Sequence, residues 1–162
     1  MKIAFLTLTV FSIILTSCER SGSGKCTETN ISTAARASHN RGEDCSSCHT
    51  SGGQGRGCFQ ICGSAFESNK STPMQNAVMV LFTRNKNGDI KDSLGNFIGV
   101  SKPISLDKTG NFYTTESTNF LDKSPAIIHK GDTIIMGGTL SSGNCNSCHS
   151  TKGSQEPIYS YK

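Results

Sequence analysis

The sequence predicts a mainly β protein: a small antiparallel β-sandwich flanked by two segments that contain the pattern Cys-x-x-Cys-His and short helical turns. Between these segments, short apolar runs and stretches of alternating apolar and polar residues are separated by turns rich in Gly, Asn and Asp. No stretch of this region has the repeat of an amphipathic helix. The chain of 162 residues suits one small domain.

The N-terminus has the features of an export signal. Lys2 gives a short positive start, and residues 3–15 form an uncharged apolar run that is too short to span a bilayer as a stable helix. The run ends in Leu15–Cys18 (LTSC), which resembles the lipobox of bacterial lipoproteins. The resemblance implies that residues 1–17 are a lipoprotein signal peptide and that a diacylglycerol is attached to Cys18. An ordinary signal peptide with a nearby cysteine is the alternative.

Export and lipid attachment predict a membrane-anchored lipoprotein that faces the periplasm or the cell surface. Residues 18–38 are rich in Ser, Thr and Gly, which predicts a lipidated flexible tether. Removal of residues 1–17 takes away one lysine and no acid, so the net charge falls from +4 to +3. This small excess, without any run of Lys or Arg, argues against a nucleic-acid partner.

The predicted sandwich covers residues 58–140. Residues 58–66 alternate, and Ala77–Thr83 is a continuous apolar run of the kind expected for a strand buried on both faces. A weaker strand is predicted at Asn96–Val100, and residues 107–113 form a turn that leads into another strand.

Part of this region resembles a known sandwich. The run Ala77–Leu81, followed by the pattern Asp107-x-x-Gly110-x-Phe112, is similar to the carboxypeptidase-regulatory-like, transthyretin-type fold. The resemblance covers about 80 residues and implies two packed antiparallel sheets.

Two copies of Cys-x-x-Cys-His flank the predicted sandwich, at Cys45–His49 (CSSCH) and Cys145–His149 (CNSCH). Two thiols three residues apart can form thioethers to the two vinyl groups of one haem, and the histidine that follows is then held beneath the iron as its proximal ligand. With 8 Cys and 4 His in 162 residues, one chance copy is rare and two are far rarer. At these ten positions the chain resembles the c-type cytochromes.

The resemblance to c-type cytochromes implies two covalently attached c-type haems, with residues 39–57 as the first haem-binding segment and residues 141–162 as the second haem-binding segment and polar tail. The implied activity is electron transfer rather than catalysis, between extracytoplasmic redox proteins or membrane electron carriers. The implied cofactor-binding residues, of which the two histidines are the proximal iron ligands, are Cys45, Cys48, His49, Cys145, Cys148 and His149.

The sixth position of each iron has few candidates. Beyond His49 and His149 the chain has only two histidines. His39 lies six residues before Cys45, and it need not serve the nearer haem. His129 is the second candidate distal ligand.

The position of His129 follows from a predicted hairpin, Pro125–His129 and Thr133–Met136, around a Gly131-Asp132 loop of type II′. With this loop His129 is predicted to pair with Ile134. Four residues then share one face of the hairpin, which would form a wall over the second haem: Ile127, His129, Ile134 and Met136. Because a methionine sulfur also binds haem iron, Met136 is the alternative to His129 as distal ligand.

Three cysteines remain after the lipid and the haems are assigned. If Cys58 and Cys62 lie in one extended strand, their Cα atoms are about 13 Å apart. A disulfide requires less than about 7 Å. These two residues should therefore not pair, whereas Cys26 can pair with either of them.

Two other functions stay open. A haem enzyme or a gas or redox sensor requires an open iron site with reactive groups above it, and Arg41 and Asp44 are among the charged residues near the first motif. A non-haem surface lipoprotein, in which the Cys-x-x-Cys pairs form disulfides or bind zinc, leaves the histidine that follows each pair unexplained.

Overall fold

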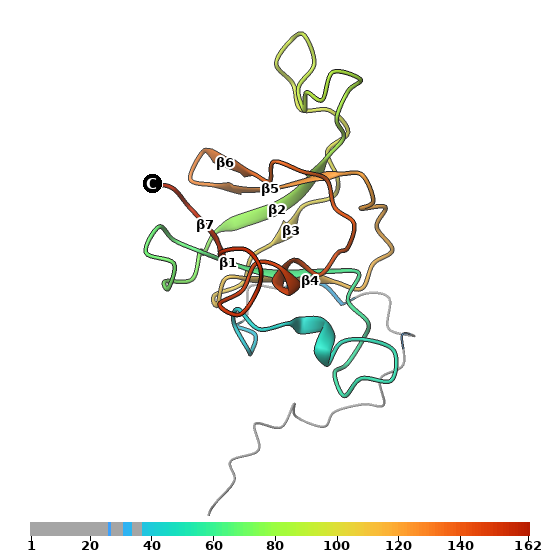
Figure 1. The fold of residues 1–162 in the computed structure, drawn as a ribbon, viewed down its shortest axis with the longest axis vertical. Helices are drawn as coiled ribbons and strands as arrows, with labels where there is room; N and C mark the ends of the chain where they lie inside the picture. The colour runs from blue at the N-terminus through green and yellow to red at the C-terminus, as the bar shows by residue number, and fades with distance from the viewer. Residues whose placement is uncertain (1–25, 27–30, 34–36) are drawn as a thin grey trace, which may run out of the picture.

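The structure, a computed structural model, describes Cys26, residues 31–33 and residues 37–162. These residues confirm the predicted fold class: they form a mainly β protein whose strands make two sheets (Figure 1), and their helical structure consists of short 3₁₀ turns. The signal peptide and Cys18 lie outside the described residues. Among the described residues, no helix is long and apolar enough to cross a membrane.

The first sheet has the order β4-β1-β7. Its central strand, β1 (Ile61–Phe66), is buried along its whole length. The neighbour β4 (Asn111–Thr114) pairs with it antiparallel, and β7 (Ile158–Tyr159) pairs with it in parallel. The C-terminal segment, predicted as a polar tail, therefore contributes a strand to the sheet.

The second sheet has the order β3-β2-β5-β6. Its strands are antiparallel, with β2 (Ala77–Phe82) between the short β3 (Ile104–Ser105) and β5 (Ser124–His129). The edge strand β6 (Asp132–Ile135) pairs with β5 as a hairpin.

The main core lies between the two sheets. It joins β1 and β4 to β2 and β5 through side chains that include Ile61, Phe112, Met79 and Ile127. The opposite face of β2 is also buried, in a second cluster around Phe82. This cluster is covered by residues of the loop between β2 and β3, which projects from the molecule in Figure 1. Burial on both faces explains the continuous apolar run of β2.

The β5–β6 hairpin has a different register from the predicted one. His129 pairs with Asp132, and the loop residues are Lys130 and Gly131. Both have positive φ, 49° and 83°, as a type I′ turn requires. The predicted Gly131-Asp132 loop is therefore wrong. The pairing shifts by two residues, and because side chains alternate with a period of two, the predicted set of residues still shares a face.

The predicted strand at Asn96–Val100 is not formed. The loop there turns around Asp92, whose side chain accepts hydrogen bonds from the backbone of Leu94 and Asn96, each 2.9 Å long. Only an isolated bridge, between Lys91 and Phe97, gives this loop any β character.

The described parts of the predicted tether are attached to the sandwich. A disulfide joins Cys26 to Cys58, with Cα atoms 4.9 Å apart. Residues 31–33 hydrogen-bond the end of β4, as in the bond of 2.9 Å from the Thr33 amide to the Tyr113 carbonyl. As predicted, Cys58 and Cys62 do not pair, because Cys62 is a free thiol within β1.

Candidate functional site

The two Cys-x-x-Cys-His motifs adopt the same local structure. Each starts with a 3₁₀ turn, η1 (Cys45–Ser47) or η2 (Cys145–Ser147), preceded by an extended residue. In each motif the backbone amide of the histidine donates to the carbonyl of the first cysteine, at 2.9 Å for His49 and 2.8 Å for His149. Both cysteines and the histidine are therefore placed around one tight turn.

The loop after each motif folds back over it in the same way. The carbonyl of Cys48 accepts a hydrogen bond of 2.8 Å from the amide of Gly55, and the carbonyl of Cys148 accepts one of 3.0 Å from Gln155. This packing requires glycine at the position five residues after the second cysteine. A Cβ at Gly53 would lie 2.1 Å from the Cys48 carbonyl oxygen, and the equivalent distance for Gly153 and Cys148 is 2.0 Å.

Each motif histidine is held by a backbone carbonyl seven residues downstream. His49 Nδ1 lies 2.9 Å from the carbonyl oxygen of Arg56, and His149 Nδ1 lies 2.8 Å from that of Glu156. Because a carbonyl only accepts hydrogen bonds, Nδ1 must carry a proton, and in the neutral ring Nε2 then has the lone pair. Metal-ligating histidines are oriented in this manner, with the other ring nitrogen donating to a backbone carbonyl or a carboxylate.

The charge state of His49 also suits metal binding. Burial lowers the pKa of its imidazole, and the nearby His39 lowers it further, whereas the hydrogen bond to the Arg56 carbonyl acts in the opposite direction. The net lowering favours the neutral ring, which is the form that binds metals.

Aromatic rings stack on the first motif. The ring of His49 lies parallel to that of Phe59 with centroids 4.0 Å apart, and Phe59 stacks in turn on Tyr113 at 4.7 Å. The ring of His39 is 5.9 Å from that of His49. The structure therefore brings the candidate distal ligand His39 beside the proximal histidine of the nearer motif.

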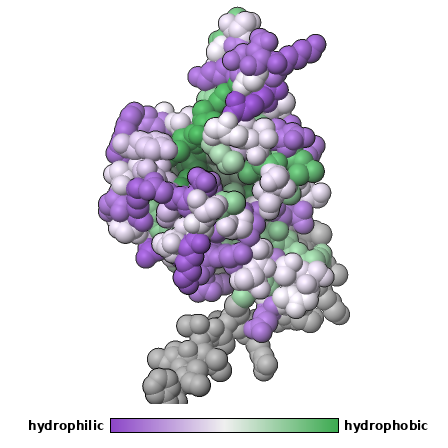
Figure 2. Space-filling view, viewed as in Figure 1, coloured by the Kyte–Doolittle hydropathy of each residue, from purple (hydrophilic) through white to green (hydrophobic). Residues whose placement is uncertain are grey.

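The second motif borders a largely apolar pocket of about 330 Å³. This volume lies at the lower end of the range for cofactor sites, about 300–1,000 Å³. Its walls come from the β5–β6 hairpin, from the segment that contains the motif and from the C-terminal segment. Figure 2 shows a recess with apolar surface on this face of the molecule. The lining residues central to the site are Ile127, Ile134, Met136, Cys145, Cys148, His149 and Ile158.

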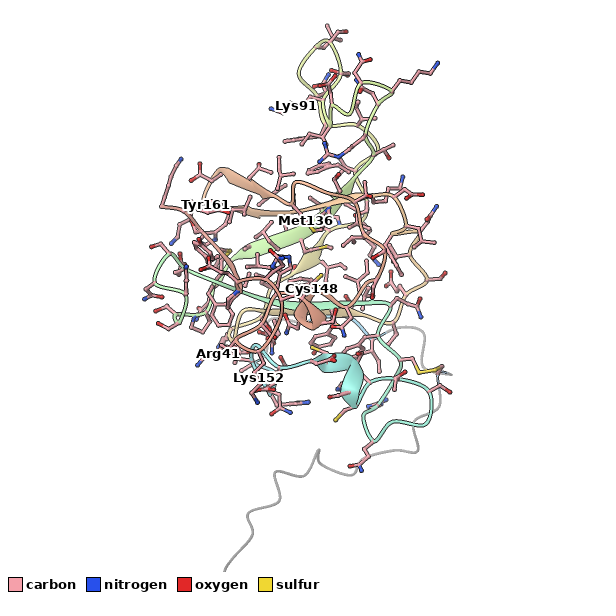
Figure 3. The ribbon with its side chains drawn as sticks, viewed as in Figure 1. Arg41, Lys91, Met136, Cys148, Lys152 and Tyr161 are labelled. Carbon is pink, nitrogen blue, oxygen red and sulfur yellow. A yellow bond between two sulfur atoms is a disulfide. The ribbon has the colours of Figure 1, made fainter. Side chains whose placement is uncertain are left out.

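The two candidate distal ligands of the hairpin lie in different places. Met136 lines the pocket together with Cys148, and Figure 3 shows both on the same side of the molecule. His129 is not among the lining residues and is 4% exposed. Its Nε2 lies 3.1 Å from a carboxylate oxygen of Glu67, which also binds Lys130 at 3.3 Å.

The motif cysteines differ in their surroundings. Burial raises the pKa of the Cys145 thiol to about 12, and this thiol reaches the pocket, whereas Cys148 is exposed. The Cys45 thiol has a lowered pKa, because it is hydrogen-bonded to the thiol of Cys62. Cys48 takes part in a disulfide in this structure.

The starts of the two motifs touch each other. The Asn144 side-chain amide donates to a carboxylate oxygen of Asp44 at 2.7 Å, and that of Asn146 donates to the Glu43 carbonyl at 2.7 Å. Figure 1 shows the two short turns side by side, although the chain passes through the whole sandwich between them. The sequence pattern contains no signal for this contact, since polar residues before a helical turn are common caps.

Comparisons with known proteins do not identify a relative: no family model, curated protein or solved structure matches the chain. Among the described residues, no group of three or more His, Cys, Asp or Glu side chains is arranged to hold a metal ion. The resemblances to c-type cytochromes and to the transthyretin-type sandwich therefore stay predictions.

Proposed function

We propose that the protein is an exported dihaem c-type cytochrome, anchored by a lipid at Cys18, that transfers electrons between extracytoplasmic redox partners. The observation that supports this most strongly is the hydrogen bond from each motif histidine to a backbone carbonyl. It occurs in both motifs, at the same offset, and leaves Nε2 of His49 and of His149 as the nitrogen with the lone pair.

The residues present fit this cofactor. Each motif offers two cysteines and an imidazole on one turn, and the second motif has an apolar pocket against it. When bound, haem iron supplies reversible one-electron oxidation and reduction.

For the distal position at the first motif we propose His39. If haem were bound at this motif, His49 and His39 would be the residues that hold its iron. The rings of His39 and His49 are 5.9 Å apart.

For the distal position at the second motif we propose Met136 rather than His129. Met136 shares the pocket with His149, whereas His129 is buried against Glu67 at the other end of the hairpin. Histidine and methionine ligation raises the reduction potential relative to ligation by two histidines. The second haem should therefore have the higher potential.

The surroundings of the pocket favour an electron carrier over a haem enzyme. A catalytic site needs acid, base or anion-stabilising groups near an open iron position. Among the residues that line the pocket, Glu156 is the only Asp, Glu, Lys or Arg, and its carboxylate is paired with Lys70 at 2.9 Å. Methionine at the sixth position would also close the iron to substrate.

The test is to mature the protein in a host that attaches c-type haem, and to measure the pyridine haemochrome spectrum and the intact mass. The wild type should contain two covalent haems. Cys48→Ser and Cys148→Ser should each lose one thioether or one whole haem at the altered motif. Ser93→Ala, an exposed substitution in the loop between β2 and β3 and outside both motifs, is the control and should keep both haems.

Retention of the wild-type mass and absorbance by both motif variants would rule out the dihaem proposal. The anchor is tested separately with labelled fatty acid. The wild type should incorporate the label and Cys18→Ala should not, and equal labelling of the two would exclude lipid attachment at Cys18.

A further inference from the structure

We infer that Asn144 and Asn146 are positioning residues that hold the two motifs together as one unit, so that the haems at the two motifs interact and do not titrate independently. The inference rests on the proposed function and deepens it. It assigns a role to a contact between segments that lie 100 residues apart in the sequence.

The first part of the contact joins the residues that begin the two turns. Asp44 and Asn144 are the N-cap residues of η1 and η2. The Asn144 side-chain amide donates to Asp44 Oδ1 and to Ser46 Oγ, both at 2.7 Å. One amide therefore binds both the cap and the turn of the other motif.

The second part is buried. Asn146 lies between the two cysteines of its motif and is 1% exposed. Its amide nitrogen donates to the Glu43 carbonyl at 2.7 Å, and its amide oxygen accepts from the Ser64 backbone amide at 3.0 Å. Since Ser64 lies in the centre of β1, this residue fastens both motifs to the sheet.

The first cysteines of the two motifs also meet near one residue. The Cys62 thiol donates to Oδ1 of Asn144 at 3.7 Å, and the Cys45 thiol lies close enough to the Cys62 thiol to have its pKa lowered by it. The backbone amide of Cys62 in turn donates to the Gly143 carbonyl at 2.9 Å. The attachment points of the two haems are thus packed around a single position of β1.

Asp44 is held as an anion within this contact. Burial acts to raise the pKa of its carboxyl, but hydrogen bonds from Ser46 and Asn144 lower it overall. A rigid contact between the motifs fixes the separation of the haems. If both haems were bound, the charge added on oxidation of one would therefore influence the other, and the two titrations would be interdependent.

The test compares the wild type with Asn144→Asp, which replaces the amide donor by a second carboxylate next to Asp44 and so drives the motifs apart. Asn119→Asp introduces the same charge at an exposed position and is the matched control. Asn144→Ala removes the donor without adding charge, and it replaces Asn144→Asp in the comparison if the acidic variant does not fold. Haem content is measured first, for every variant, by the pyridine haemochrome.

The wild type and the control should show a two-signed Soret band in circular dichroism and two one-electron steps in a redox titration. In the Asn144 variants the two-signed band should lose most of its amplitude and the two steps should change their separation, with both haems retained. Two haems without a two-signed band in the wild type, or Asn144 variants identical to the wild type, would overturn the inference alone. Absence of covalent haem from the wild type would overturn the proposed function as well.

Discussion

Replacement of Gly153 by alanine should remove haem from the second motif and leave the first motif loaded. A Cβ at this position would lie 2.0 Å from the carbonyl oxygen of Cys148, whereas ordinary contacts start at 3.4 Å. The loop after the motif therefore has to move by about 1.4 Å, and its backbone cannot give way as a flexible side chain would.

The cost of this movement follows from the bonds that it breaks. The Gly153 amide donates to Ser150 at 3.1 Å, and the Gln155 amide donates to Cys148 at 3.0 Å. Loss of two hydrogen bonds costs about 2 kcal/mol, and overpacking adds about 1–3 kcal/mol. The free energy of unfolding should fall by about 3–5 kcal/mol if the fold cannot relax. The same movement takes the Glu156 carbonyl away from His149, which loses its orientation.

The assay has two parts. Urea unfolding of the haem-free protein measures the decrease in the free energy of unfolding. The pyridine haemochrome spectrum of the matured protein measures the number of haems, which should fall from two to one. Gly137→Ala is the matched control, because a Cβ there meets nothing within 4 Å. Gly53→Ala should give the same effect at the first motif. If Gly153→Ala keeps both haems and the wild-type unfolding midpoint, the packing argument fails.

Two further predictions concern the distal ligand and acid stability. Met136→Ala should convert one ferric haem from low spin to high spin and let it bind carbon monoxide when reduced, whereas His129→Ala should not; the reverse result would assign the iron to His129. Burial acts to raise the pKa of Asp107, but hydrogen bonds led by those of Ser38 and Thr109 lower it overall. Its contribution to stability should be complete above the ordinary Asp pKa of about 3.9 and be lost as the pH falls through the lowered value. The urea midpoint measured against pH should therefore have a weaker acid dependence in Asp107→Asn, and an unchanged profile would contradict this.

The fold could be predicted from the sequence where strands are long enough to have a period. Ala77–Phe82 is recognisable because both of its faces are buried, so nearly every residue is apolar. Ile104–Ser105 and Ile158–Tyr159 have two residues each, which is too short for any alternation, and their place is decided by packing against strands distant in sequence.

The site was only partly predictable, because some of its contacts are made by the backbone and not by side chains. Side-chain chemistry identifies the motifs, but the groups that orient His49 and His149 are backbone carbonyls, which have no sequence signature. The hairpin loop was missed because Lys130 adopts a positive φ of 49°, which is uncommon for lysine. The two-residue shift keeps the predicted face and moves Met136 from opposite Ile127 to opposite Pro125, further from His129.

The sandwich acts as a scaffold that brings the two motifs together rather than as a spacer between them. Strand β1 follows directly after the first motif segment, and its Ser64 hydroxyl accepts a hydrogen bond of 3.0 Å from the Gly42 amide, just before that motif. The chain then builds the second sheet and returns to β1, where Gly143 accepts from Cys62 immediately before the second motif. Because both motifs are fastened to the same central strand, insertions in the outer loops need not change their separation. A substitution in β1 should alter both sites at once, so Ser64 links fold stability to the proposed electron transfer more directly than residues of the projecting loop.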